Sequence, residues 1–407
     1  MRFFLAVTLA VCASLSLAQT DVANGTVVKV GCLYPLSGAG GLYGRDSQVA
    51  IAMAQDHLAA KGGYPKLDVT VRDSRSKTLR SLLIARSFVE DDGVDFLCGV
   101  VSSAVALTVS DYARSSETFF IGTDHASPAL TSTHLHPYYF RVTNGARQSM
   151  SAGAQYIAEH YAAQGLLKIS FIGPDYDYGY RSYEDLRRFL DDLGVQYDVV
   201  STYWPKLFDT DFSLYIRNIM ADEPDIVVNA HWGLDLVTFV RQADRLGLFK
   251  QSQFMNFDTG GNYEILAELG SDMPAGLVLS ARHHLNWPKT AANQTFVQEF
   301  HQRTGRFPSY SAEGAYSGIL AIAEAVRQAG GTADKEKIKT ALETLSLALP
   351  EDPDGFQSYM DPKHHQIMQA QAIGRTGPNA DFPPAQMMLT DISVYFPPPQ
   401  WPDFSGQ

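Results

Sequence analysis

The chain has 407 residues, which is enough for two domains, and 45% of them are hydrophobic, which is ample for packed cores. Asp and Glu (44 residues) outnumber Lys and Arg (32 residues), so the formal net charge is -12. A surface of that sign repels phosphate backbones, and the composition therefore argues against a nucleic acid partner.

The N-terminal sequence is typical of a cleaved secretory signal peptide, which we place at residues 1–18. Arg2 supplies the positive flank, residues 3–17 form an apolar region, and residues 16–18 (Ser-Leu-Ala) resemble a cleavage site. The apolar run is too short for a comfortable transmembrane helix. We therefore expect a mature protein that works outside the cytoplasm.

Short apolar runs rich in β-branched and aromatic residues recur along the rest of the chain, and each of them predicts a strand. They are residues 27–34, 67–73, 94–101, 118–122, 168–173, 196–204, 225–231, 253–258 and 275–280. Segments with helical apolar spacing lie between them, and a long helix is predicted over residues 311–328. Strands that alternate with helices indicate βαβ units, so we predict an α/β fold with parallel sheets.

Two cysteines follow the predicted signal peptide. Cys32 lies in the first predicted strand and Cys98 in the third, and we expect these strands to be neighbours. A disulfide between them is one prediction for an oxidising compartment. Two buried thiols are the alternative, because adjacent parallel strands do not always bring the Cβ atoms close enough.

Two loops that connect a predicted strand to a helical segment resemble each other. Residues 35–44 read PLSGAGGLYG and residues 173–179 read GPDYDYG, so both loops end in Tyr-Gly. This weak repeat suggests two similar α/β lobes, whose ligand would bind beyond the carboxyl ends of the strands. The first loop matches neither the G-x-G-x-x-G nor the G-K-[ST] nucleotide signature, and the start of its helix suits a carboxylate instead.

Polar and aromatic side chains follow several of the predicted strands. The segment 123–127 (Thr-Asp-His-Ala-Ser) either caps a helix or presents hydroxyl and N–H groups to a cleft, and Ser103 has the same two interpretations. Tyr43, Tyr178 and Trp232 lie in loops just past strands, although core packing is the alternative for each. No spacing predicts a zinc site and no G-x-S-x-G motif is present, so we expect neither a metal nor a hydrolase.

Taken in order, several segments resemble the periplasmic ligand-binding proteins of ABC importers, in the branched-chain amino-acid-binding group. They are KVGCLYPLSGAGGLYGRD, GVVSSAVALTVSDYA, FFIGTDHASPALT, KISFIGPDYDYG, DIVVNAHWGLDL and LFKQSQFMNFD. The resemblance covers the chain from about Thr26 to Tyr395. It implies the type I periplasmic binding protein fold, in which two Rossmann-like lobes joined by a three-strand hinge close on a small ligand. Neither an enzymatic reaction nor a cofactor is implied.

The same resemblance, together with polar proline-bearing segments, suggests where the lobes begin and end. We expect the first lobe in residues 26–144 and 282–350, and the second lobe in residues 145–281 and 351–395. An irregular tail is expected over residues 396–407. The resemblance further implies a periplasmic monomer that takes up a small molecule and docks on an ABC transporter permease at the membrane surface.

Ligand-binding residues are also implied by the resemblance. They are Tyr43, Ser103, Asp124, His125, Ala126, Ser127, Tyr178, Trp232 and Asp258. Ser103 and residues 124–127 would bind a ligand carboxylate, the aromatic residues would pack on its apolar part, and Asp258 would pair with an amino group. Asp124 and His125 stand where the family has small residues, and Asp258 replaces the usual Glu. Aliphatic amino acids and amine-free aromatic or aliphatic carboxylates are therefore both candidate ligands.

Two other functions compete with import. An extracytoplasmic sensor would use the same closure of two lobes to report a ligand to a membrane receptor. An enzyme would use Asp124 and His125 as an acid/base pair. We disfavour the enzyme because adjacent residues at a strand end rarely face each other, and no third orienting group is visible.

Overall fold

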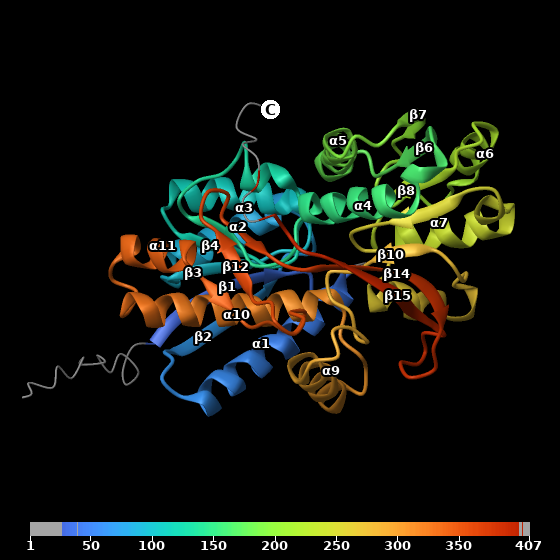
Figure 1. Ribbon diagram of the computed structural model, residues 1–407. Helices are drawn as coiled ribbons and strands as arrows, with labels where there is room; N and C mark the ends of the chain where they lie inside the picture. The colour runs from blue at the N-terminus through green and yellow to red at the C-terminus, as the bar shows by residue number, and fades with distance from the viewer. Residues whose placement is uncertain (1–26, 39, 399–400, 402–407) are drawn as a thin grey trace, which may run out of the picture.

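Residues 27–38, 40–398 and 401 are described by the structure, which is a computed structural model. The chain folds into two α/β lobes that lie side by side (Figure 1). The predicted signal peptide lies outside the described residues. Within them, no helix has both the length and the apolar character needed to cross a membrane.

The first lobe is built on an eight-stranded sheet with the order β11-β12-β13-β5-β4-β3-β1-β2. Its strands are β1 (Val27–Tyr34), β2 (Lys66–Asp73), β3 (Phe96–Gly99), β4 (Phe119–Gly122), β5 (Tyr139–Arg141), β11 (Ser346–Leu347), β12 (Ser358–Asp361) and β13 (Gln366–Met368). Strands β1 to β5 are parallel. Along β1, Val30 and Cys32 face one side of the sheet and Leu33 faces the other, because side chains alternate on a pleated strand.

The second lobe is built on a seven-stranded sheet with the order β15-β14-β10-β9-β8-β6-β7. Its strands are β6 (Leu167–Ile172), β7 (Tyr197–Tyr203), β8 (Ile226–Asn229), β9 (Gln253–Asn256), β10 (Val278–Ser280), β14 (Gln371–Pro378) and β15 (Met387–Tyr395). Strands β6 to β10 are parallel, whereas β14 and β15 are antiparallel to their neighbours. Each of the strands predicted from the sequence is present in one of the two sheets, with ends shifted by a few residues.

Helices cover both faces of each sheet (Figure 1). In the first lobe, one face carries α1 (Gly41–Lys61), α10 (Tyr310–Ala329) and α11 (Lys335–Glu343), and the other carries α2 (Thr78–Glu90) and α3 (Ser103–Ser115). In the second lobe, one face carries α4 (Ala146–His160) and α5 (Asp177–Asp192), and the other carries α6 (Ser213–Ala221), α7 (Gly233–Leu246) and α8 (Tyr263–Leu269). Helix α9 (Ala291–Thr304) contacts α1. Short 3-10 helices are η1 (Pro128–Thr131), η2 (Ala162–Gln164), η3 (Leu248–Lys250) and η4 (Gly270–Asp272).

The described chain changes from one sheet to the other between β5 and β6, between β10 and β11, and between β13 and β14. The last change differs from the expected lobe boundary at residue 351. Strands β12 and β13 still belong to the first sheet, because β13 pairs with β5 through Gln366 and Arg141. The proline-bearing segment near residue 351 is therefore a turn within the first lobe, and the third crossover lies between Met368 and Gln371.

A disulfide joins Cys32 on β1 to Cys98 on β3. The two strands are adjacent and parallel, and their register places these two residues directly opposite each other. Both side chains are buried. Of the two alternatives left open by the sequence, the structure has the disulfide.

Candidate functional site

A cavity of about 510 Å³ lies between the two lobes. The first lobe contributes residues that follow β1, β2 and β3, and the second lobe contributes residues that follow β7, β8 and β9. Tyr43, Val101, Phe208, Trp232 and Ile265 are among the side chains that form its mostly apolar lining. A cavity of this size and lining fits a small organic ligand, and its place beyond the carboxyl ends of parallel strands agrees with the general rule for such sheets.

The two Tyr-Gly loops have the same structural role in the two lobes. A Cβ atom on Gly44 would lie 2.1 Å from the carbonyl oxygen of Pro35, and a Cβ atom on Gly179 would lie 2.1 Å from that of Pro174. Only glycine permits this close approach of the loop to the first turn of the helix. The tyrosines that precede these glycines lie in the first turns of α1 and α5, where Tyr43 lines the cavity and Tyr178 is buried with its hydroxyl bonded to Asp258.

Trp232 forms the wall of the cavity opposite Tyr43. It immediately precedes α7, and its indole Nε1 donates a hydrogen bond to the Tyr176 hydroxyl at 3.0 Å. The Phe208 ring lies 6.3 Å away, edge to face. A Cβ atom on Gly233 would lie 3.5 Å from the Tyr43 hydroxyl oxygen, so the start of α7 and the first lobe are in contact here. Two of the predicted aromatic residues therefore face one cavity from opposite lobes.

Glu264 also lines the cavity, and the sequence reasoning missed it. It lies in the first turn of α8, and neither of its carboxyl oxygens has a hydrogen-bond partner among the described residues. Burial raises the pKa of Glu264 to about 7. Burial, followed by the charge of Glu264, raises the pKa of Tyr43 well above its usual value. Tyr310, the first residue of α10, packs against Tyr43 with 5.3 Å between ring centroids.

The serines at the predicted carboxylate site lie where the two lobes meet. Ser103 begins α3, and its hydroxyl accepts a hydrogen bond from the N–H of Ser127 at 3.2 Å. Ser127 caps η1 and donates its hydroxyl to Asp177 at the start of α5 in the other lobe. The carbonyl oxygen of Ala126 accepts from the N–H of Ala146 at 3.0 Å. The capping interpretation of Ser127 is thus correct, and the same residue also links the lobes.

His125 does not face the cavity. Its Nδ1 lies 2.9 Å from the Val100 carbonyl oxygen and its Nε2 lies 2.8 Å from the Tyr139 hydroxyl, so both ring nitrogens are hydrogen-bonded within the first lobe. The ring stacks on Phe120 with 5.7 Å between centroids. Burial lowers the pKa of His125 to about 3, which keeps the ring neutral. The His125 ring is therefore part of the core and does not face the cavity, whereas a contact between the main chain of residues 124–127 and a ligand carboxylate stays a prediction.

The Asp124 carboxyl group is also turned into the first lobe. It accepts a hydrogen bond from the Thr123 hydroxyl, whose oxygen lies 2.7 Å from that of Tyr34. Helix α10 covers the other oxygen, since a Cβ atom on Gly314 would lie 3.0 Å from it. Burial raises the pKa of Asp124 to about 7. The Asp124 carboxyl group and the His125 ring thus have separate partners. The structure therefore does not support Asp124 and His125 as an acid/base pair.

Asp258, which follows β9, forms a buried ion pair with Arg282. Nε of Arg282 lies 3.0 Å from Oδ1 of Asp258, and Nη2 lies 2.6 Å from Oδ2. Tyr178 donates its hydroxyl to Oδ2 at 2.7 Å, and Ser149 donates to Oδ1 at 3.0 Å. Burial alone would raise the pKa of Asp258, but the charge of Arg282 together with the hydrogen bonds from Arg282, Tyr178 and Ser149 outweighs it and lowers that pKa. Asp258 is therefore ionised and already holds a cation of the chain itself.

Arg282 is the second functional residue that sequence reasoning missed. It follows β10 directly, at the start of the second crossover between the lobes. Its Nη1 donates to the carbonyl oxygen of Asp124 in the first lobe, and its guanidinium lies 5.1 Å from the centre of the Tyr310 ring. The signal that could have identified it is its position, because it follows a strand in the same way as the predicted site residues.

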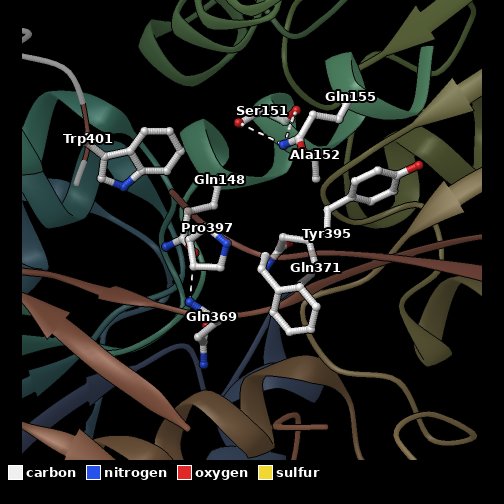
Figure 2. A pocket seen from close by; sticks show the side chains of 10 residues that line it. Gln148, Ser151, Ala152, Gln155, Gln369, Gln371, Tyr395, Pro397 and Trp401 are labelled. Carbon is white, nitrogen blue, oxygen red and sulfur yellow. Dashed lines mark hydrogen bonds between the residues drawn. The ribbon is translucent and has the colours of Figure 1, made fainter. Parts of the chain in front are cut away.

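A second, very small cavity lies on the side of α4 and can be excluded as a ligand site. Figure 2 shows its lining, which includes Gln148 on α4, Gln369 and Gln371 at the third crossover, and Trp401 in the tail. Its volume is about 10 Å³, which is near the minimum for one water molecule. Among the described residues of the tail expected to be irregular, Trp401 is buried and donates its indole N–H to the Met368 sulfur at 3.1 Å.

Comparisons with known proteins agree with this architecture. A family model described as periplasmic binding protein matches residues 27–380. The leucine-, isoleucine-, valine-, threonine- and alanine-binding protein of Pseudomonas aeruginosa is 24% identical over 365 residues, which cover 89% of this chain and 93% of that protein. The family and fold predicted from the sequence are therefore confirmed.

Solved structures with the same fold include proteins for different ligands. An ABC transporter solute-binding protein from R. palustris in complex with 4-hydroxybenzoate has a TM-score of 0.79 at 19% identity, covering 92% of this chain and 99% of that one. A leucine-binding protein from Thermotoga maritima has a TM-score of 0.73 at 18% identity, covering 91% of this chain and 98% of that one. At these identities the likeness establishes the fold alone.

Proposed function

We propose a ligand class and a delivery step for this chain, which belongs to the periplasmic binding protein family and is a solute-binding protein of an ABC transporter. The protein captures a small carboxylate-bearing molecule between its lobes and delivers it to the permease of that transporter. The observation that carries the proposal is the cavity of about 510 Å³ with walls from both lobes. A site whose walls belong to two lobes is complete only when they close.

Closure is supported by polar contacts that cross from one lobe to the other. Ser127 donates to Asp177, and Arg282 donates to the Asp124 carbonyl oxygen. Each of these hydrogen bonds involves a charged group and contributes roughly 1.5–3 kcal/mol net, so the two together stabilise the closed form by only a few kcal/mol and leave the open form accessible. A ligand that contacts both walls binds the closed form better and shifts the population toward it. The closed form then docks on the permease.

The two ends of the ligand have different surroundings in this proposal. Its carboxylate meets Ser103 and the main chain of residues 126–127, beside the N-terminus of α3, which favours a negative charge. Its apolar part lies between Tyr43 and Trp232. Aromatic carboxylates such as 4-hydroxybenzoate and aliphatic amino acids such as leucine are the candidates that the structural neighbours and relatives supply.

A thermal-shift screen of ligand-stripped mature protein tests the ligand class. A ligand at a hundred times its Kd raises the free energy of unfolding by about 2.7 kcal/mol, which moves the melting temperature by several degrees. We expect stabilisation by small carboxylates and none by the matching primary amides, which lack the charge. If no small carboxylate stabilises the protein, the proposed ligand class is wrong.

Delivery to a permease is tested separately. Purified permease in proteoliposomes should hydrolyse ATP faster with the liganded protein than with the ligand-free protein. N-terminal sequencing of protein from a periplasmic extract should begin at Gln19 if the signal peptide is removed as proposed. Tight ligand binding without any stimulation of ATP hydrolysis would favour the sensor over the importer.

A further inference from the structure

We infer, on the basis of the proposed function, that Arg282 determines specificity: it fills the cation site between the lobes, so the protein selects carboxylates that lack an α-ammonium group. The acceptors at this site are the carboxylate of Asp258 in the second lobe and the carbonyl oxygen of Asp124 in the first. The Tyr310 ring covers the cation from one side, at 5.1 Å. Carboxylate, carbonyl and aromatic face are the groups that bind an ammonium ion.

The Asp258 carboxylate has no acceptor capacity left for a ligand. An ionised carboxylate has about four lone-pair sites. Asp258 accepts from Nε and Nη2 of Arg282, from the Tyr178 hydroxyl and from the Ser149 hydroxyl. The two side chains of the ion pair are only 5% and 1% exposed, so water does not screen their attraction. A ligand ammonium would have to displace the guanidinium and leave it buried, which is strongly unfavourable.

Other carboxyl groups near the lobe junction do not replace Asp258 as an ammonium partner. The Asp124 carboxyl group is buried beneath α10, and Asp177 already accepts from Ser127 and pairs with Arg181. Glu264 and Glu268 line the cavity, but burial raises the pKa of Glu264 to about 7, which favours its neutral form below that pH, and Glu268 already pairs with Arg241. A neutral carboxyl group attracts an ammonium ion only weakly. An amine-free carboxylate meets none of these conflicts.

Matched ligand pairs that differ only in the ammonium group provide the test. The pairs are 3-phenylpropanoate with L-phenylalanine and 4-methylpentanoate with L-leucine, and benzoate is added as a rigid amine-free probe. Isothermal titration of the ligand-stripped protein should show at least one amine-free member binding at least 30-fold more tightly than its amino acid. An amino acid that binds within threefold of its amine-free partner, or more tightly, contradicts the role of Arg282 and leaves the proposed function standing.

If no member of the panel binds, the proposed function fails, and the role of Arg282 fails with it.

The Arg282→Met variant should open the cation site, so that the ratio of the two dissociation constants within each ligand pair falls below threefold. Arg86→Met is the matched control, because Arg86 lies outside the cavity lining, pairs with Glu90 on the exposed face of α2 and should keep the wild-type ratio. Should Arg282→Met fail to fold, Arg282→Met with Asp258→Asn removes both charges. That variant should keep the preference for amine-free ligands, because it offers an ammonium no counter-charge.

Amino acid binding that is lost in Glu264→Gln would place an ammonium site at the cavity wall instead. That outcome overturns the inference.

Discussion

Removing the Asp258 carboxylate is the perturbation whose cost the structure fixes best. In Asp258→Ala, Arg282 keeps its charge but loses the carboxylate that accepts from its Nε and Nη2. Breaking a buried ion pair by removing one partner costs about 3–5 kcal/mol, because the remaining charge stays desolvated. The pair is 5% and 1% exposed, so we expect the upper half of that range. The hydroxyl of Tyr178 loses its acceptor as well.

Two further variants separate this ion pair from a general effect of losing a charge. Asp272→Ala removes one of the two carboxylates that pair with Arg241, whose Nε lies 3.1 Å from Asp272 in a pair that is 32% and 59% exposed. That change should cost less than about 1 kcal/mol, because water screens the pair. Asp258→Ala combined with Arg282→Met should cost less than the two single changes together, with a coupling of at least about 2 kcal/mol.

Urea unfolding followed by tryptophan fluorescence and by circular dichroism measures these differences. Two lobes need not unfold in one step, so both probes are needed to decide whether a single free energy applies. Equal costs for Asp258→Ala and Asp272→Ala would show that Arg282 and Asp258 are not a buried pair in solution. Additivity within about 0.5 kcal/mol in the double variant would show that they are not coupled.

Four other changes test separate features. Trp232→Ala should weaken ligand binding by about 1–3 kcal/mol, whereas Trp204→Ala, at a ring that packs on Tyr180, should not; equal affinities would remove Trp232 from the site. His125→Ala should lower stability by about 3 kcal/mol and leave the Kd within threefold, because the ring is hydrogen-bonded in the core; a larger loss of affinity would restore it as a ligand contact. The pKa of Glu264 is raised to about 7 in the folded protein, so between pH 5 and 7 the folded state binds a proton that the unfolded state does not. The stability that comes from this proton is lost as the pH rises. Urea unfolding should therefore show that the free energy of unfolding of Glu264→Gln rises by about 1–2 kcal/mol relative to the wild type from pH 5 to 8. If the two free energies change in parallel with pH, this reasoning is refuted. Cys98→Ser opens a bond between residues 66 apart and should cost about 4 kcal/mol by chain entropy, while an unchanged midpoint would mean that the bond is absent in solution.

Local patterns in the sequence were sufficient to predict most of the parallel strands. Runs of four to eight apolar residues mark strands that are buried on both faces, and β1, β3, β4, β6, β8 and β9 are such strands. The antiparallel strands β14 and β15 were not predicted, because their polar and apolar residues alternate less regularly and their pairing depends on distant partners. Whether β12 and β13 belong to the first lobe likewise depends on a distant contact, because β13 pairs with β5.

The sequence by itself determined which residues follow the strands. It therefore also identified Tyr43 and Trp232 as an aromatic pair, because the Tyr-Gly loop and the start of α7 position these two side chains locally. Only the tertiary structure decided where the polar side chains at those ends point. His125 points into the first lobe because Val100 and Tyr139 provide its hydrogen-bond partners. Arg282 pairs with Asp258 because they follow β10 and β9, which are neighbouring strands of the second sheet. The ends of strands follow from the periodicity of apolar residues along the chain. A buried polar side chain, in contrast, points toward the group that completes its hydrogen bonds, and that group usually comes from a segment distant in sequence.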